Sequence, residues 1–284
     1  MVFEILHACF LNTDWATFYK SIIQQYTMKN TLLLFLLMSL TTVEAQNLSE
    51  VQAQIIHWDS LTAKTENGRT RRLLVEGTTT HLKYFRVHAT TIQPGTAPNP
   101  AHPNQDADEL HIIKEGKVEY TIGDKKQVVE AGGVAVIMSN EVHGLRNVGD
   151  TPATYYVFRY QSKNPTDLER GQKAGGSLMI NAEDNPLKTH AKGTRRDFYN
   201  RSTTQCTAFE MHTTALNAGL ESHQPHTHKT EEALLITKGT ITMVIDCKIY
   251  QAKAGDLVIL SSNIPHALIN TSGAQCEYFA FTWQ

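Results

Sequence analysis

One set of polar residues occurs twice in this chain, and this repeat constrains the fold more than any other feature. The repeated residues are His102, Glu109, His143 and Asn147 in the first half and His226, Glu232, His266 and Asn270 in the second. The copies are 124 residues apart at the first histidine and 123 residues apart at the other three positions. One deletion before the glutamate accounts for the difference. Two His/Glu/His sets in register indicate a duplicated domain with a metal-type site in each copy.

The repeat extends well beyond these residues. Further matching pairs are Thr70-Arg71-Arg72 with Thr194-Arg195-Arg196, Phe85 with Phe209, His88 with His212, Gly95 with Gly219, Gly116 with Gly239, Gly132 with Gly255 and Tyr160 with Trp283. A repeat of this length is too long for a solenoid unit, so each copy is expected to have its own core. We predict domains over residues 70–160 and 194–284, preceded by an N-terminal segment over 46–69 and joined by a connector over 161–193.

Composition supports this organisation and excludes one class of partner. A chain of 284 residues is long enough for two domains. A hydrophobic fraction of 41% and a charged fraction of 19% are typical of a globular protein. The net charge is −2 and no long basic run occurs, so we expect no nucleic-acid partner.

Residues 28–45 have the pattern of a secretory signal peptide. Met28-Lys29 provides a positive start, an apolar run covers residues 31–40, and Val43-Glu44-Ala45 offers a cleavage site after Ala45. The alternative is a buried core helix. The apolar run is too short for a comfortable membrane span, so we expect no stable membrane anchor. Residues 1–27 are interpreted as a doubtful upstream extension. The predicted location is therefore periplasmic or secreted.

After residue 70 the pattern is that of short strands. Runs rich in Val, Ile, Thr, Tyr and Phe alternate with Gly, Asn, Asp and Pro turns. The predicted strands are 84–92, 109–113, 117–122, 127–130, 134–138 and 154–159 in the first copy, and 208–216, 233–237, 240–245, 257–260 and 277–281 in the second. The best candidate for a helix is Ser49–Leu61. The chain is thus predicted to be all-β, with one short N-terminal helix.

The second half resembles a cupin domain. Its motifs are Gly219, then His226-Thr-His228-Lys-Thr-Glu-Glu232 and Gly239, followed by Gly255-Asp256, Pro265-His266 and Asn270. The first half carries a weaker version of the same motifs. The whole chain therefore resembles a bicupin, which implies two tandem β-barrels of the jelly-roll type.

The second copy holds the more complete ligand set. Residues two apart on a strand point to the same side, so His226 and His228 are expected to face the barrel interior. Glu232 and His266 complete a set of three imidazoles and one carboxylate, which leaves open positions on a six-coordinate ion. Such a set suits a divalent first-row metal. The resemblance to cupins implies manganese, iron, nickel or zinc.

The first copy departs from this set at one position. Asn104 replaces the second histidine, and an amide oxygen is a poorer donor to such metals. His102, Glu109 and His143 are still able to form a set with two waters. A site occupied by metal and a vestigial site both remain open.

Several other residues are candidates for roles near these sites. Glu231 adjoins Glu232 and is either a surface carboxylate or a catalytic acid or base. His223 is either a loop residue or a residue at the pocket entrance. His88 and His212 are structural or catalytic. The duplicated arginine pairs, Arg71-Arg72 and Arg195-Arg196, either brace loops or bind a substrate carboxylate.

The resemblance implies a class of function rather than a single reaction. The leading hypothesis is an exported, metal-dependent bicupin enzyme that acts on a small oxygenated metabolite at the second-domain site, with dioxygenase-like or decarboxylase-like chemistry. The alternatives are a bicupin aminohydrolase or isomerase, and a non-catalytic periplasmic cupin that binds a sugar or a metal. Pairing into a homodimer is compatible with each of them.

Overall fold

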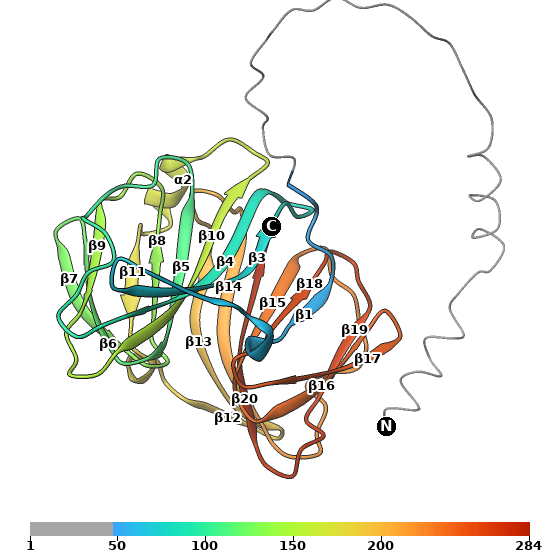
Figure 1. The fold of residues 1–284 in the computed structure, drawn as a ribbon. Helices are drawn as coiled ribbons and strands as arrows, with labels where there is room; N and C mark the ends of the chain where they lie inside the picture. The colour runs from blue at the N-terminus through green and yellow to red at the C-terminus, as the bar shows by residue number, and fades with distance from the viewer. Residues whose placement is uncertain (1–47) are drawn as a thin grey trace, which may run out of the picture. The chain divides into compact units, whose positions relative to one another are not determined.

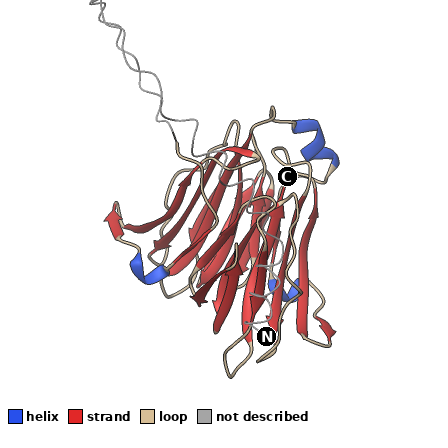
Figure 2. Ribbon diagram, turned by 90° about the vertical axis from the view of Figure 1, so that its right-hand side faces the viewer, coloured by secondary structure: helices blue, strands red, loops and turns tan. Residues whose placement is uncertain are grey.

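The computed structural model describes residues 48–284, and this part of the chain is almost entirely β-structure (Figure 1, Figure 2). The predicted signal peptide at 28–45 and the extension at 1–27 lie outside the described residues. No helix within residues 48–284 is long and apolar enough to cross a membrane.

The first domain consists of two antiparallel sheets. The larger sheet has seven strands in the order β11 (Leu178–Ile180), β8 (Val134–Ile137), β5 (Asp108–Glu115), β10 (Ala153–Ser162), β4 (Leu82–Ile92), β3 (Arg69–Gly77) and β2 (Ala63–Glu66). The smaller sheet has three strands in the order β7 (Lys125–Glu130), β6 (Lys117–Ile122) and β9 (His143–Asn147).

The second domain repeats this architecture. Its larger sheet has the order β1 (Gln54–Ile56), β18 (Leu257–Leu260), β15 (Glu231–Lys238), β20 (Cys276–Trp283), β14 (Phe209–Leu216), β13 (Gly193–Arg201) and β12 (Lys188–His190). Its smaller sheet has the order β17 (Lys248–Lys253), β16 (Thr240–Ile245) and β19 (His266–Ile269).

These sheets confirm the all-β prediction and correct one detail of it. Strands 117–122, 240–245 and 257–260 have the predicted bounds, and the other predicted strands differ from β4, β5, β7, β8, β10, β14, β15 and β20 mainly at their ends. The domains are not closed barrels, because the seven-stranded and three-stranded sheets remain separate hydrogen-bonded units. Each domain is a β-sandwich.

The predicted helix at Ser49–Leu61 is wrong. This segment forms strand β1 and a short 3-10 helix, η2 (Trp58–Ser60). Strand β1 pairs with the otherwise free edge of β18, and tertiary pairing of this kind overrides a local preference. Asp256 holds the following turn, because its buried carboxylate accepts hydrogen bonds from the Trp58 backbone N–H and from His57 Nδ1, each at 2.9 Å.

The two domains exchange edge strands. Strand β1 precedes the first domain in sequence but belongs to the sheet of the second, and β11 precedes the second domain but belongs to the sheet of the first. The connector around β11 also contains one short α-helix, α2 (Leu168–Lys173), and a 3-10 helix, η3 (Ala182–Asp184). The exchange ties residues 48–284 into one compact unit.

Three apolar cores fill the spaces between the sheets. The largest lies between the two seven-stranded sheets, where Phe158 meets Phe281 with ring centroids 4.7 Å apart and Phe85 stacks on Trp283 at 5.3 Å. Each domain has a second core between its own two sheets. Strand β10 has apolar side chains on both of its faces. Phe158 faces the shared core, while its neighbour Val157 faces the first-domain core. Polar residues that lie on the inner face of a sandwich therefore line the site of that domain.

Candidate metal centre

The second-domain site forms where the loop before β15 meets the start of β19. His226 in this loop and His266 on β19 pair through two backbone hydrogen bonds of 3.2 and 3.1 Å. The coordinating nitrogens of His226, His228 and His266 lie within 4.8 Å of one another. Glu232 Oε2 on β15 lies 3.2 Å from His228 Nε2 and 3.3 Å from His266 Nε2. The fold thus brings the four predicted ligands to one point.

Hydrogen bonds to backbone carbonyls orient two of these histidines for metal binding. The Nδ1–H groups of His228 and His266 donate to the backbone carbonyls of Thr230 and Ile264, at 2.8 and 2.9 Å. This fixes the tautomer that leaves Nε2 with a free lone pair, as in metal-ligating histidines. The buried Nε2 of His266 has no hydrogen-bond partner among the described residues, despite its short distance to Glu232. These donors fit a divalent cation.

The protonation states also favour a cation. Burial disfavours the Glu232 carboxylate, but its close contacts with the imidazoles of His228 and His266 outweigh this effect and lower its pKa to about 2. Burial and three neighbouring imidazoles lower the pKa of His226 to about 4. At neutral pH the carboxylate is therefore charged and His226 is neutral, which are the forms that bind metal.

A cavity of about 300 Å³ lies beside these ligands. Glu232 and His266 form part of its wall, and His223 packs edge-on against His226 with ring centroids 4.0 Å apart. The predicted candidate His212 also lines this cavity, where its Nδ1 lies 2.7 Å from Glu210 Oε1. The structure thus places His223 and His212 beside the ligand set.

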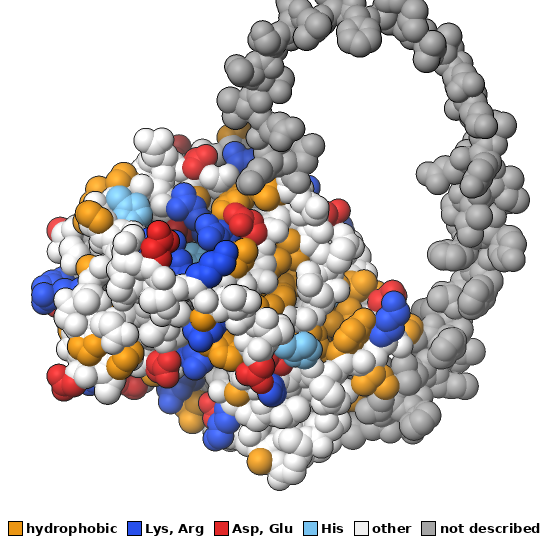
Figure 3. Space-filling view, in the orientation of Figure 1, with side chains coloured by type: hydrophobic (Ala, Val, Ile, Leu, Met, Phe, Trp, Pro, Cys, Tyr) orange, Lys and Arg blue, Asp and Glu red, His pale blue; other side chains and the backbone are white. Residues whose placement is uncertain are grey.

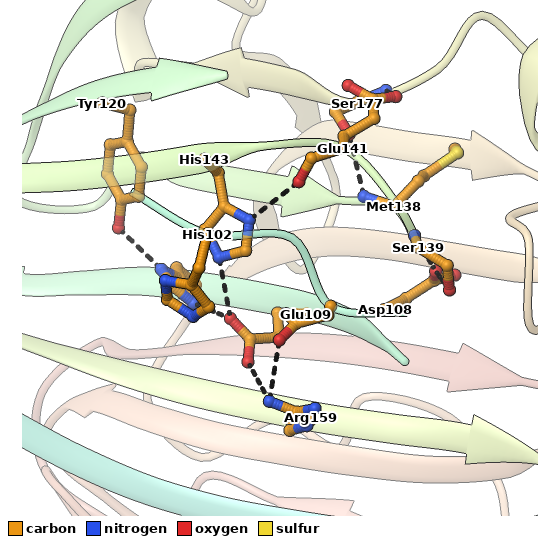
Figure 4. A network of polar contacts seen from close by, with 12 residues as sticks. His102, Asp108, Glu109, Tyr120, Met138, Ser139, Glu141, His143, Arg159 and Ser177 are labelled. Atoms are coloured by element: carbon orange, nitrogen blue, oxygen red, sulfur yellow. Dashed lines mark hydrogen bonds and ion pairs between the residues drawn. The ribbon is translucent and has the colours of Figure 1, made fainter. Parts of the chain in front are cut away.

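The first-domain site keeps part of the same construction (Figure 4). His102 and His143 pair through backbone hydrogen bonds, and their rings are 4.8 Å apart. Their Nδ1 atoms lie 2.9 Å from the Pro100 carbonyl and 3.1 Å from the Glu141 carbonyl, so their Nε2 atoms also face inward. The histidine framework has therefore been conserved between the two copies of this chain.

A cationic side chain contacts two residues of the first-domain set. Arg159 on β10 donates from Nη1 to Asn104 Oδ1 at 2.8 Å and lies 3.4 Å from Glu109 Oε1 (Figure 4). The other carboxylate oxygen of Glu109 is 2.9 Å from His111 Nε2. Burial disfavours the Glu109 carboxylate, but His111, His143 and Arg159 together outweigh this effect and lower its pKa to about 2. The charge that a metal would neutralise is already neutralised.

Among residues 48–284, only His226, His228 and His266 form a group of three with ligand spacing. The first-domain arrangement therefore favours the vestigial interpretation of His102, Asn104, Glu109 and His143.

Comparison with known proteins agrees with this two-domain architecture. A family model described as the cupin domain matches residues 88–159 and 213–282, which together make up half of the chain. The chain belongs to the cupin family. No protein of curated function matches its sequence.

Solved structures show the same two-domain cupin fold. A putative glyoxylate-induced protein from Pseudomonas aeruginosa has a TM-score of 0.67 and 13% identity, over 84% of this chain and 92% of the other. The protein Ylba from E. coli has a TM-score of 0.64 and 14% identity, over 84% and 95%. An oxalate decarboxylase mutant from Bacillus subtilis has a TM-score of 0.63 and 12% identity, over 82% and 77%. At these identities the likeness establishes the fold alone.

Glu231 does not take part in either cupin site, which corrects the prediction of a catalytic acid or base. Its buried carboxylate accepts hydrogen bonds from Thr79 Oγ1 at 2.6 Å, from the backbone N–H groups of Thr80 and His81 at 3.0 Å, and from Trp283 Nε1 at 3.0 Å. Glu231 and Glu232 are adjacent on β15 and so point to opposite faces of the sheet. Glu231 joins the two cupin domains.

The sequence motifs did not point to three polar residues beside the first-domain site. Arg159, His111 and Tyr120 form the network around Glu109, and His111 Nδ1 lies 3.0 Å from the Tyr120 hydroxyl. The equivalent positions of the second copy hold Thr282, Leu234 and Met243. A comparison of the two copies outside the motifs would have singled these residues out, because each is polar in one copy only or changes charge.

We expect Asn104→His alone to create no metal site in the first cupin domain. The reason is that Arg159 would still place a positive charge beside Glu109. The double variant Asn104→His/Arg159→Thr copies the second domain, and it is expected to bind about one additional metal equivalent. Elemental analysis checks both, with Arg159→Thr alone as the control. Full binding by Asn104→His alone would show that Arg159 does not exclude the metal.

Proposed function

We propose that this protein is an exported, metal-dependent bicupin enzyme that acts on a small oxygenated metabolite at the second-domain site. The observation that carries the proposal is the convergence of His226, His228, Glu232 and His266 beside a cavity of about 300 Å³, whose wall includes Glu232 and His266. That volume is within the range of small-molecule sites. Oxidative or decarboxylating chemistry is the favoured class, and oxalate decarboxylases are among the proteins that share the fold.

The four ligands would hold a divalent manganese, iron, nickel or zinc ion. When bound, such an ion polarises substrate oxygens as a Lewis acid. Ligands from a loop and two strands leave the cavity side open for a substrate carboxylate, enol or hydroxyketone. The buried setting of His266 and the largely buried side chain of Glu232 would strengthen electrostatic interactions with that substrate.

His212 replaces Glu231 as the candidate for proton transfer. It lies in the cavity wall, and Glu210 accepts its Nδ1–H at 2.7 Å. This contact holds one tautomer and leaves Nε2 to accept a proton from substrate. Tyr278 also lines the cavity, and its hydroxyl donates to Ser222 Oγ at 3.1 Å.

Turnover is tested with the metal-loaded protein against a panel of small carboxylic acids, hydroxyketones and enols. Oxygen consumption and carbon dioxide release are measured for the wild type and the His266→Ala variant. Turnover that disappears in the variant supports the proposal. Stoichiometric ligand binding without turnover would instead indicate the non-catalytic cupin, and release of ammonia or an isomerised product would indicate the aminohydrolase or isomerase class.

The predicted signal peptide over residues 28–45 leads to a separate prediction. A gene product that starts at Met28 is expected to be exported and cleaved after Ala45, because a positive start and an apolar core precede a small residue there. Mass spectrometry of the purified protein would then give a chain that begins at Gln46. The Leu36→Arg variant, which interrupts the apolar core, is the control and should stay uncleaved. An uncleaved amino terminus on the wild-type protein would contradict the predicted export.

A further inference from the structure

The first-domain cavity is unusually rich in arginine. Three guanidinium groups, those of Arg71, Arg86 and Arg159, line a cavity of about 150 Å³ on the inner face of strands β3, β4 and β10. Arg71 and Arg86 also border an adjoining depression that includes Arg69 and Lys64. Lys and Arg side chains gather on the first-domain side of the molecular surface (Figure 3).

These arginines are poorly neutralised by the protein itself. Arg86 and Arg159 are direct neighbours across strands β4 and β10, an arrangement that places like charges side by side. The buried Nε atoms of Arg71 and Arg86 have no hydrogen-bond partner among the described residues. Glu76 approaches Arg86 Nε only to 4.0 Å, and Glu109 is shared with His111. Burial and the neighbouring arginines also lower the pKa of Arg71.

The second domain is an internal control, because it contains the same strands without the charge excess. Arg195 is the counterpart of Arg71, and it is neutralised by Asp197 at 2.5 Å and Glu210 at 2.7 Å. The first domain has Leu73 in place of Asp197 and Arg86 in place of Glu210. Both changes remove a negative charge from the neighbourhood of the conserved arginine, so the fold itself does not require the arginine cluster.

We propose that the first-domain cavity is a metal-independent binding site for a small dicarboxylate. Guanidinium groups bind carboxylates in a paired, forked geometry, and three of them line this one cavity. Three arginines outnumber the nearby carboxylates of Glu109 and Glu76, so the cavity keeps a net positive charge that favours a ligand with carboxylate groups. This site is separate from the second-domain metal centre and from the activity proposed there.

Isothermal titration of the purified protein with malonate and succinate tests the proposal, with acetate and inorganic phosphate as comparison anions. A dicarboxylate is expected to bind with a stoichiometry of about one and to raise the melting temperature in a concentration-dependent manner. Removal of metal with a chelator, and the His266→Ala variant, should both leave this binding unchanged. Binding that is lost on either treatment would place the anion at the second-domain metal instead and overturn the proposal.

The deciding variant is Arg86→Glu, which copies the second domain and rebuilds the Arg195–Glu210 pair in the first. It is expected to fold and to weaken dicarboxylate binding by roughly tenfold to a hundredfold, as for the loss of one charge-assisted contact. The control is Lys125→Glu, an identical charge change at an exposed position of β7. Equal affinity in the wild type and Arg86→Glu, tighter binding of phosphate than of either dicarboxylate, or no binding at all would each refute the assignment.

Discussion

The His266→Ala variant is expected to lose the bound divalent metal while keeping the cupin fold. His266 contributes a buried Nε2 atom that faces the ligand set and has no other partner. Even loss of an outer partner of a metal ligand costs about 10–100-fold in affinity, so loss of the ligand itself should cost at least roughly a hundredfold. Elemental analysis of the purified protein measures this directly, as about one metal equivalent in the wild type and a small residue in the variant.

The duplication provides a matched control for this experiment. His143 occupies the equivalent position in the first domain, with the same backbone pairing and the same contact of Nδ1 to a carbonyl. Because Arg159 neutralises the first-domain carboxylate, His143→Ala is expected to leave the metal content unchanged. Full metal retention by His266→Ala, or an equal loss in both variants, would defeat the assignment of the metal to the second domain.

The Glu231→Ala variant is expected to be strongly destabilised while its metal site stays intact. Glu231 connects Thr79, Thr80 and His81 of the first domain with Trp283 of the second through four hydrogen bonds to one buried carboxylate. Its removal leaves these donors without an acceptor in the interior. We expect the free energy of unfolding to fall by about 3 kcal/mol, as for hydrogen bonds to a buried charged group. Urea denaturation measures the loss.

Glu231→Gln serves as the comparison, because the amide keeps one acceptor oxygen and the shape of the side chain. It should be destabilised less than the alanine variant. Metal content should stay at the wild-type level in both, since Glu231 points away from His228 and His266. A Glu231→Ala protein with unchanged stability but altered metal binding or activity would return this residue to the active site.

Asp108 is the counterpart of Glu231, which shows that the clamp between domains is itself duplicated. Its buried carboxylate accepts hydrogen bonds from the backbone N–H groups of Ser139 and Gln205, at 2.8 and 3.1 Å, and from the hydroxyl of Thr204. Residues 204 and 205 precede the second-domain strand β14, just as residues 79–81 precede β4. Each domain therefore offers one acid to a loop between two strands of the other domain, Glu231 to the β3–β4 loop and Asp108 to the β13–β14 loop.

The repeat in the sequence determined the architecture and the main site. Matching histidines and glutamates 123 or 124 residues apart predicted two duplicated domains, and the resemblance of their motifs implied cupins. Alternation along runs such as 117–122 and 240–245 predicted strands that the structure confirms. Strand alternation is a local feature, because it can be read from a few neighbouring residues. The gathering of His226, His228, Glu232 and His266 followed from the motif, although His266 lies far along the chain.

Only the tertiary structure decided which partners each polar side chain meets. The sequence of Ser49–Leu61 does not indicate that Gln54–Ile56 pairs with the edge of β18, which lies some two hundred residues away. Arg159 belongs to no motif, yet the fold of the first domain brings it to Asn104 and beside Glu109, whose charge it neutralises. Likewise, Glu231 and Glu232 are chemically identical neighbours. The face that each occupies places Glu231 in the contact between domains and Glu232 in the candidate metal centre. Such contacts depend on residues distant in sequence, and so on the packing of the whole sheet.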